Sequence, residues 1–172
     1  MINNKNKRII TVSPNDKELG FKSFEETHLG KGILHRAITI FIFNNRGEIL
    51  LTKRSNKKML WPGFWDTTCS SHPTSRETYE KAGMRRLKEE LGINCNLKLI
   101  GKFQYKAKYN NIGSENEICA LLTGTFVGKI VPNLDEISEY KWITVGDLKK
   151  EIKKVNSISP WLKIAFKRYI KL

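Results

Sequence analysis

The chain has 172 residues, a length that fits a buried core with a pocket beside it, so we expect residues 1–172 to form a single domain. Its 31 Lys and Arg residues outnumber 17 Asp and Glu, and the formal charge of +14 suits an anionic partner: nucleic acid, a membrane surface or a phosphorylated small molecule. The charge does not choose among these, and a cationic surface without a specific partner is an equally good interpretation.

Apolar runs in the sequence are all shorter than the roughly 20 residues that a membrane span needs. The first ten residues, MINNKNKRII, also lack the apolar segment of a signal peptide. We therefore expect a cytoplasmic protein without a membrane span. The cysteines, Cys69, Cys95 and Cys119, form no C-x-x-C pair and are odd in number. Reduced thiols are expected, with at least one unpaired within the chain.

The first third of the chain favours strands. Residues 8–12 form a short predicted strand before the turn-rich segment SPNDKELG, and HLGKGIL is a loop broken by glycines. The segments ILHRAITIFIF and EILLTKR flank the turn NNRG, and their β-branched and aromatic residues predict a hairpin.

The remainder mixes helix and strand. Residues 77–91, ETYEKAGMRRLKEEL, predict a helix that stops at Gly92. Further strands are predicted at about 98–108, about 117–127 and about 139–143. The final segment, SPWLKIAFKRYIKL, predicts a terminal helix with Pro160 in its first turn. Repeats and low-complexity linkers are absent from the sequence.

One face of the predicted helix at 77–91 carries charge. Arg86, Glu89 and Glu90 are three and four residues apart and therefore share that face. Carboxylate oxygens on such a face suit Mg²⁺, which keeps waters and bridges to phosphate oxygens. The alternative interpretation is a solvated face with Arg/Glu ion pairs.

The segment from Glu77 resembles the Nudix box, whose pattern ends in R-E-x-x-E-E-x-G. Here the corresponding residues read RRLKEELG. Ser71 stands where the box has its first glycine, and Arg86 replaces the first of the metal-binding glutamates. The loss of that carboxylate argues against a pyrophosphohydrolase, whereas a cation there can pair directly with a diphosphate.

A second set of candidate ligands comprises the three histidines and two glutamates. Glu115 and Glu117 are two apart in a predicted strand, so both reach one site. Three imidazoles with two carboxylates suit a divalent ion such as Mn²⁺, Mg²⁺ or Zn²⁺. A lone histidine, by contrast, is more often packed or surface-exposed than a ligand. The candidate ligands are His28, His35, His72, Glu115 and Glu117.

Taken together, these segments resemble type I isopentenyl diphosphate isomerase, a Nudix-fold family, over nearly the whole chain. The resemblance rests, in order, on HLGKGILHRA, LLTKRSNKKMLWPGFWDTTCSSHP, RRLKEELG, YKAKYNNIGSENE and SPW. It implies an α+β fold, a Nudix-like α/β/α sandwich with mixed β-sheets and flanking helices. It also implies isomerisation of isopentenyl diphosphate to dimethylallyl diphosphate.

The resemblance assigns roles to individual residues. It makes the three histidines, Glu115 and Glu117 the ligands of one metal ion, while Glu90 and the main-chain carbonyl of residue 70 hold a second Mg²⁺ on the diphosphate. The implied phosphate contacts are Arg54, Lys58 and Arg86, and the implied isoprenoid pocket includes Tyr105 and Trp161. The family's early phosphate-contacting lysine falls on Phe24, and Lys22 is the candidate substitute.

The reaction needs an acid, a base and stabilisation of a carbocation-like state. The family's proton carriers are a metal-bound glutamate, matching Glu117, and a cysteine at the position of Ser70. Cys69 lies one residue earlier, so in an extended strand it points to the opposite face. Ser70 can relay a proton through water or Tyr105, or the chain has kept the scaffold and lost rate; both alternatives stay open.

Two other functions compete with the isomerase. A Nudix pyrophosphohydrolase acting on a nucleoside diphosphate or another small diphosphate tolerates Ser70, because its nucleophile is metal-bound water. A basic RNA-binding module predicts aromatic residues interleaved with Lys on an exposed sheet, a pattern that KFQYKAKY has. The isomerase reading predicts an isoprenoid diphosphate as partner, no nucleic acid, and a monomer or homodimer.

Overall fold

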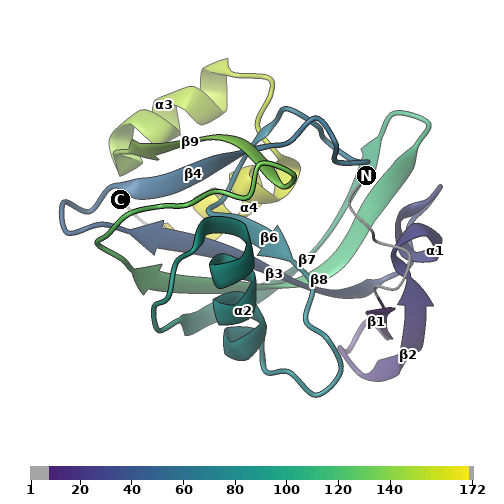
Figure 1. Cartoon of the computed structure of the whole chain (residues 1–172). Coiled ribbons are helices and arrows are strands. Elements are labelled where there is room, and N and C mark those ends of the chain that lie inside the picture. The colour runs from purple at the N-terminus through teal and green to yellow at the C-terminus, as the bar shows by residue number, and fades with distance from the viewer. Residues whose placement is uncertain (1–7, 171–172) are drawn as a thin grey trace.

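A computed structural model describes residues 8–170 of the chain. One mixed sheet is covered by helices on both faces (Figure 1). The strands are β1 (Arg8–Val12), β2 (Glu18–Ser23), β3 (His35–Phe43), β4 (Ile49–Arg54), β5 (Trp65–Asp66), β6 (Cys69–Ser71), β7 (Lys98–Tyr109), β8 (Gly113–Thr125) and β9 (Ile137–Ile143), and the helices are α1 (Phe24–His28), α2 (Tyr79–Leu91), α3 (Val145–Lys154) and α4 (Pro160–Tyr169). Among the described residues, none of these helices is long and apolar enough to cross a membrane.

The centre of the sheet is a parallel pair. β3 and β8 run in register from the His35–Glu117 pair to the Phe43–Thr125 pair. On its other edge β8 pairs with β7, and β3 also pairs with the short β6, both antiparallel. The β3 sequence is apolar on both faces because both faces are covered, as is usual for parallel strands. The mixed sheet between helices confirms the predicted α/β/α sandwich.

The predicted turn between β3 and β4 is present, but the predicted pairing of these two strands as a hairpin is wrong. The chain does reverse at NNRG, where the Asn44 side-chain carbonyl accepts from two backbone amides. The strands then share a single pair, Phe43 with Ile49. β4 instead pairs with β9 and with β5. Strand propensity and turn chemistry identified the two strands, but pairing follows burial against distant segments, which local pattern does not contain.

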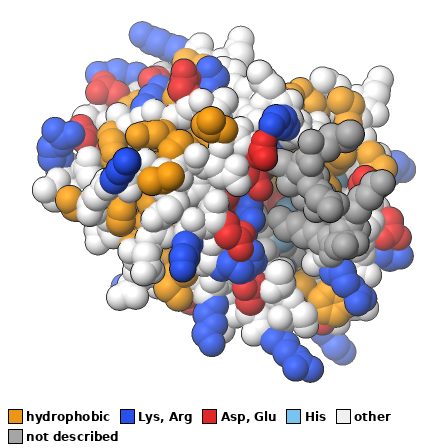
Figure 2. Space-filling model, viewed as in Figure 1, with side chains coloured by type: hydrophobic (Ala, Val, Ile, Leu, Met, Phe, Trp, Pro, Cys, Tyr) orange, Lys and Arg blue, Asp and Glu red, His pale blue; other side chains and the backbone are white. Residues whose placement is uncertain are grey.

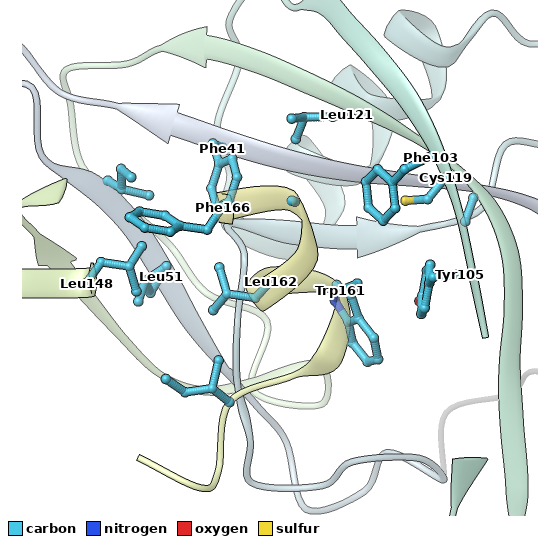
Figure 3. Packing of buried hydrophobic residues seen from close by; sticks show 14 of the residues in the cluster. Phe41, Leu51, Phe103, Tyr105, Cys119, Leu121, Leu148, Trp161, Leu162 and Phe166 are labelled. Carbon is cyan, nitrogen blue, oxygen red and sulfur yellow. The ribbon is translucent and has the colours of Figure 1, made fainter. Parts of the chain in front are cut away.

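Each face of the sheet has its own apolar core. Ile38, Ile40 and Ile42 of β3 pack against α2, and Cys69 belongs to this cluster. On the opposite face Phe41 of β3 meets α4, whose Trp161 approaches the aromatic residues of β7 (Figure 3). Strand alternation therefore sorts side chains into an α2 face and an α4 face.

Helix ends follow their capping chemistry. α2 begins at Tyr79, two residues later than predicted, because the Thr78 side chain accepts from Lys81 N and caps the helix. It stops at Gly92 as predicted, with φ of 67°, where the glycine N–H bonds back to carbonyls of the last turn. Pro160 opens α4 as predicted.

Other boundaries differ from the predictions. β8 begins at Gly113, four residues earlier than predicted, and α4 ends at Tyr169, whereas the last two residues of the predicted helix lie outside the described part of the chain. α1, α3 and β2 were not predicted. α1 has only five residues and a capping box at Ser23, too short for a periodic pattern to reveal it.

Candidate active site

Five buried side chains from four parts of the chain meet at one end of the β3–β8 pair. One ligand atom from each lies within 4.8 Å of the others. The register places His35 beside Glu117, and strand alternation brings Glu115 to the same face. α1 delivers the first histidine at its last residue, and the third follows β6 directly. The cluster comprises His28, His35, His72, Glu115 and Glu117, the set predicted from the sequence.

The backbone orients two of the imidazoles. The Nδ1 atoms of His28 and His35 each lie 2.7 Å from a carbonyl oxygen, of Phe24 and Ile33 respectively. A carbonyl only accepts, so each Nδ1 carries the proton and each Nε2 presents a lone pair to the cluster. This tautomer is the one that a metal ligand requires.

The inward-facing atoms crowd around a common centre. His28 Nε2 lies 3.2 Å from a Glu115 oxygen, and His35 Nε2 lies 3.1 Å from His72 Nε2 and 3.4 Å from a Glu117 oxygen. In the described part of the chain, His28 Nε2 and Glu115 Oε2 are buried without a hydrogen-bond partner. Buried donors and acceptors are costly without partners, and a divalent cation satisfies all of them. The residues present therefore fit a metal ion.

Electrostatics of the cluster point the same way. Burial lowers the pKa of His28, but the Glu115 carboxylate outweighs burial and the pKa is raised. Burial raises the pKa of Glu117, but its hydrogen bond and attraction to His35 outweigh burial and the pKa is lowered. The Glu117 carboxylate thus stays charged in a buried place, where a cation offsets its desolvation.

Glu117 connects this cluster to a group of aromatic side chains. Its second oxygen accepts a 2.7 Å hydrogen bond from the Tyr105 hydroxyl. Tyr105 lies 6.2 Å from Trp161 and 5.7 Å from Phe103, measured between ring centroids. Figure 3 shows these rings on the α4 face, with Trp161 reaching out from the start of α4. One carboxylate therefore borders both the ligand cluster and a set of packed aromatic rings.

β6 separates Ser70 from Cys69, as the strand period predicts. Ser70 pairs with Thr39 and projects onto the α4 face, where its hydroxyl lies 3.1 Å from Thr39 Oγ1 and 2.9 Å from Thr67 Oγ1. Cys69 is 1 % exposed and belongs to the α2 core. Burial raises the pKa of its thiol, and Glu90 raises it further.

The charged face of α2 is largely buried rather than solvated. Arg86 donates from Nε and Nη2 to one oxygen of Glu90, at 3.1 and 2.6 Å. It also donates to Glu136, 3.2 Å away, and to Glu89. The Arg/Glu ion pairs of the alternative interpretation are therefore present, but of the three residues only Glu89, whose side chain is 44 % exposed, is solvated. Figure 2 shows acidic and basic side chains interleaved down this side of the molecule, next to visible histidine surface.

Glu136 joins two of the predicted phosphate contacts. It forms ion pairs with both Lys58 and Arg86. Burial raises the pKa of Glu136, but these two cations outweigh burial and lower it to about 2. Glu136 was not predicted as a site residue. It lies in a loop 50 residues from its arginine partner, and no local motif marks it.

The remaining predicted residues are placed as follows. Arg54 lies 5.2 Å from the Trp161 ring centroid, and it bonds to Asp66 and to backbone carbonyls. Lys22 pairs with Glu26 at 3.3 Å on the surface, while Phe24 stacks on His28 at 4.1 Å. The position of the family's early lysine is thus an aromatic wall of the ligand cluster.

The aromatic residues of KFQYKAKY do not form an exposed platform. Phe103 and Tyr105 are 3 % and 7 % exposed and pack in the α4-face core. Bases cannot stack on buried rings, so the RNA-binding interpretation loses its structural basis. The alternation predicted from sequence is that of a pocket-facing strand.

Comparison with known proteins agrees with this geometry. The NUDIX domain model matches residues 33–163. Isopentenyl-diphosphate Delta-isomerase 1 of Aromatoleum aromaticum is 38% identical over 95% of this chain and 92% of its own length. The isopentenyl-diphosphate Delta-isomerase of Haloarcula marismortui is 35% identical over 96% and 92%. The chain belongs to the isopentenyl-diphosphate Delta-isomerase family within the Nudix superfamily. The family resemblance drawn from the sequence is thereby confirmed.

Solved structures with a similar fold include proteins of low sequence identity to this chain. A Deinococcus radiodurans protein superposes with a TM-score of 0.79 at 19% identity, covering 96% of this chain and all of its own. A MutT protein from Methanosarcina mazei superposes with a TM-score of 0.65 at 20% identity, covering 78% of this chain and 91% of its own. At such identities the likeness concerns the fold alone. What separates the isomerase family from other Nudix proteins must therefore be sought in the site residues.

Proposed function

We propose that this protein converts isopentenyl diphosphate to dimethylallyl diphosphate, with a divalent metal ion held by the five-residue cluster. The observation that carries the proposal is Glu117, which borders the ligand cluster through one oxygen and receives the Tyr105 hydroxyl on the other. A proton carrier must touch both a charge-stabilising site and an apolar substrate pocket. Membership of the isomerase family supports the same activity.

His28, His35, His72, Glu115 and Glu117 would hold the ion, which can be Mn²⁺, Mg²⁺ or Zn²⁺. The bound ion would supply positive charge that keeps Glu117 ionised and fixed. Tyr105 holds the free oxygen of Glu117 toward the pocket. In this geometry Glu117 moves a proton at one carbon of the isopentenyl group, and Tyr105 keeps that oxygen oriented between steps.

The opposite proton carrier in our proposal is Ser70. Its hydroxyl lies on the α4 face, the face that also carries Tyr105 and Trp161. An alcohol is a weaker acid than a thiol, so Ser70 acts as one member of a hydroxyl chain with Thr39 and Thr67 rather than as an isolated acid. Trp161 offers a π-face to the tertiary carbocation-like state.

The diphosphate end of the substrate would bind beside α2. Lys58 and Arg86 meet there at Glu136, and a diphosphate competes for the same two cations. Glu90 with the main-chain carbonyl of residue 70 would hold a second Mg²⁺ on the diphosphate. Arg54 completes the proposed phosphate contacts, although four of its hydrogen bonds already go to protein groups.

A pyrophosphohydrolase is the alternative function, and the α2 face argues against it. Hydrolysis in this fold needs the full set of carboxylates that holds the ion activating water, and Arg86 replaces the first of them. Here the Arg86 guanidinium occupies the space between Glu89, Glu90 and Glu136. We therefore rank hydrolysis of a nucleoside diphosphate below isomerisation.

The test is incubation with isopentenyl diphosphate in deuterated water containing Mg²⁺ and Mn²⁺. Deuterium in dimethylallyl diphosphate would report both conversion and the site of protonation. Release of phosphate from a panel of pyrophosphates, without conversion of isopentenyl diphosphate, would reverse the ranking. Metal-free protein serves as the control, because it should convert none of the substrate.

A further inference from the structure

Asp66 on β5 is a buried carboxylate that the proposed mechanism does not use. It is 3 % exposed and lies at the junction of the α4 start, β6 and the loop after β4. We propose that Asp66 is a positioning residue of the active site. One of its carboxylate oxygens fixes the positions of the Ser70 hydroxyl and the Trp161 indole relative to each other. The proposal rests on the function proposed above and adds a residue to which the family resemblance assigns no role.

One oxygen of Asp66 gathers the groups that act on the isopentenyl moiety. Oδ1 accepts from the Trp161 indole Nε1 at 2.5 Å and from the Ser70 hydroxyl at 3.1 Å. It also accepts from the backbone N–H of Thr67 at 2.7 Å, which fixes the carboxylate itself. Because both side chains bond to the same atom, the indole edge and the hydroxyl cannot move apart without losing a hydrogen bond.

The other oxygen reaches toward the diphosphate end. Oδ2 accepts from Arg54 Nη1 at 3.0 Å. The remaining Arg54 donors hold the carbonyls of Leu60 and Trp61, at the end of the loop that carries Lys58. Asp66 therefore ties both ends of the proposed substrate site to one charged group, a support of the kind that holds reacting groups in register.

A carboxylate suits this place because every neighbour donates. An aspartate accepts on both oxygens, whereas asparagine would keep one acceptor and turn its NH₂ against the Arg54 guanidinium. Substitution of Asp66 by Asn thus conserves volume while removing the charge and one acceptor. Nothing in this arrangement requires Asp66 to touch substrate, so its effect must pass through Ser70, Trp161 and Arg54.

The test combines steady-state kinetics with NMR on Asp66→Asn, Ser70→Ala, Trp161→Phe and their pairwise combinations. For Asp66→Asn we expect kcat to fall about 10- to 100-fold, because the hydrogen bonds that orient Ser70 and Trp161 lose their charged acceptor, with a smaller rise in KM of about 3-fold through the disturbed Arg54. Asp66→Asn should lower kcat by a smaller factor in the Ser70→Ala or Trp161→Phe background, because one of the side chains through which Asp66 acts is already removed.

Ser159→Ala is the matched control. Its hydroxyl bonds to the same Asp66 oxygen at 3.3 Å but belongs to none of the proposed site groups, so kcat should stay within about 2-fold of the parent. The proposal would be overturned if Asp66→Asn lowered kcat by the same factor in the parent, Ser70→Ala and Trp161→Phe proteins. A lowered melting temperature of Asp66→Asn with unchanged kcat would also overturn it. If Asp66→Asn does not fold, additive effects of Ser70→Ala and Trp161→Phe would overturn it instead.

An activity-independent readout separates this inference from the proposed function. The ¹⁵N-labelled protein gives indole N–H resonances, and Trp161→Phe assigns the one from Trp161. In Asp66→Asn this resonance should move upfield and lose protection from exchange, because its strongest acceptor is weakened. An unmoved resonance would reject the positioning role even in an inactive protein. Absence of conversion by the unmodified protein, with the expected shift, would reject only the proposed function.

Discussion

Adjacent residues on β6 offer the sharpest test of the proposed chemistry. Ser70 faces the α4 side with its hydroxyl in a hydrogen-bonded chain, while the Cys69 sulfur is buried in the α2 core. We expect Ser70→Cys to raise the isomerisation rate and Cys69→Ala to leave it unchanged. The two substitutions are one residue apart, so a general effect on β6 cannot explain opposite outcomes.

The expected magnitudes follow from acidity and burial. A free thiol titrates near 8.5 and an alcohol far higher, so Ser70→Cys supplies a better proton donor, and we expect kcat/KM to rise about 10-fold. Ser70 is half-buried, which leaves room for the larger sulfur. Cys69→Ala removes one buried sulfur from a packed core and should lower the free energy of unfolding by about 1–2 kcal/mol.

The assay is kcat/KM on isopentenyl diphosphate for both variants, with denaturant unfolding of each in parallel. The expected pattern is faster turnover for Ser70→Cys, and unchanged turnover at lower stability for Cys69→Ala. If Cys69→Ala abolished turnover while Ser70→Cys left it unchanged, the assignment of faces to functions on β6 would be refuted.

Three further outcomes are expected. Glu117→Gln should abolish conversion of isopentenyl diphosphate while Glu139→Gln, an exposed charge-matched control, leaves it intact; near-normal turnover of the first would contradict the role of Glu117. His35→Ala should lower bound metal in elemental analysis and remove the added stability, about 2.7 kcal/mol at metal 100-fold above Kd; unchanged stoichiometry would exclude the five-residue site. The Arg85 guanidinium lowers the pKa of Glu77 from 4.5 to about 2 in the folded state. The ionised Glu77 therefore stabilises the fold fully above pH 4.5, and this stabilisation is lost as the pH falls toward 2. Between pH 5 and pH 2 the free energy of unfolding of the parent should therefore fall by about 1–2 kcal/mol more than that of Glu77→Gln, after allowance for solvent screening. Equal falls in the two proteins would argue against the ion pair of Glu77 with Arg85.

Sequence patterns predicted the parts of the site that depend on local geometry. Strand period two is enough to put Glu115 and Glu117 on one face and Cys69 opposite Ser70, and the structure has both arrangements. The helix stop at Gly92 is equally local, since only backbone conformation and its last-turn hydrogen bonds decide it. The roles assigned to these residues remain predictions.

Long-range contacts could not be predicted in this way. β9, with which β4 shares most of its pairing, lies far along the chain, and periodicity in β4 is the same whichever strand it joins. Glu136 and Asp66 owe their importance to residues tens of positions away, Arg86 for the first and Trp161 for the second. As single acidic residues in short segments, neither differs in sequence from a solvated surface carboxylate.

The charge around α2 explains why the substrate should arrive with its own cation. Glu89, Glu90 and Glu136 face Lys58 and Arg86, so three carboxylates against two cations leave one net negative charge at the proposed diphosphate site. A diphosphate would add negative charge to a largely buried place, which is unfavourable without compensation. In our proposal Glu90 would hold Mg²⁺ on the diphosphate, and the ion would supply the compensating positive charge, while Arg86 and Lys58 would exchange Glu136 for phosphate oxygens. In this proposal Arg86, which stands where the Nudix box has its first metal-binding glutamate, contacts the diphosphate together with a metal ion that the substrate brings.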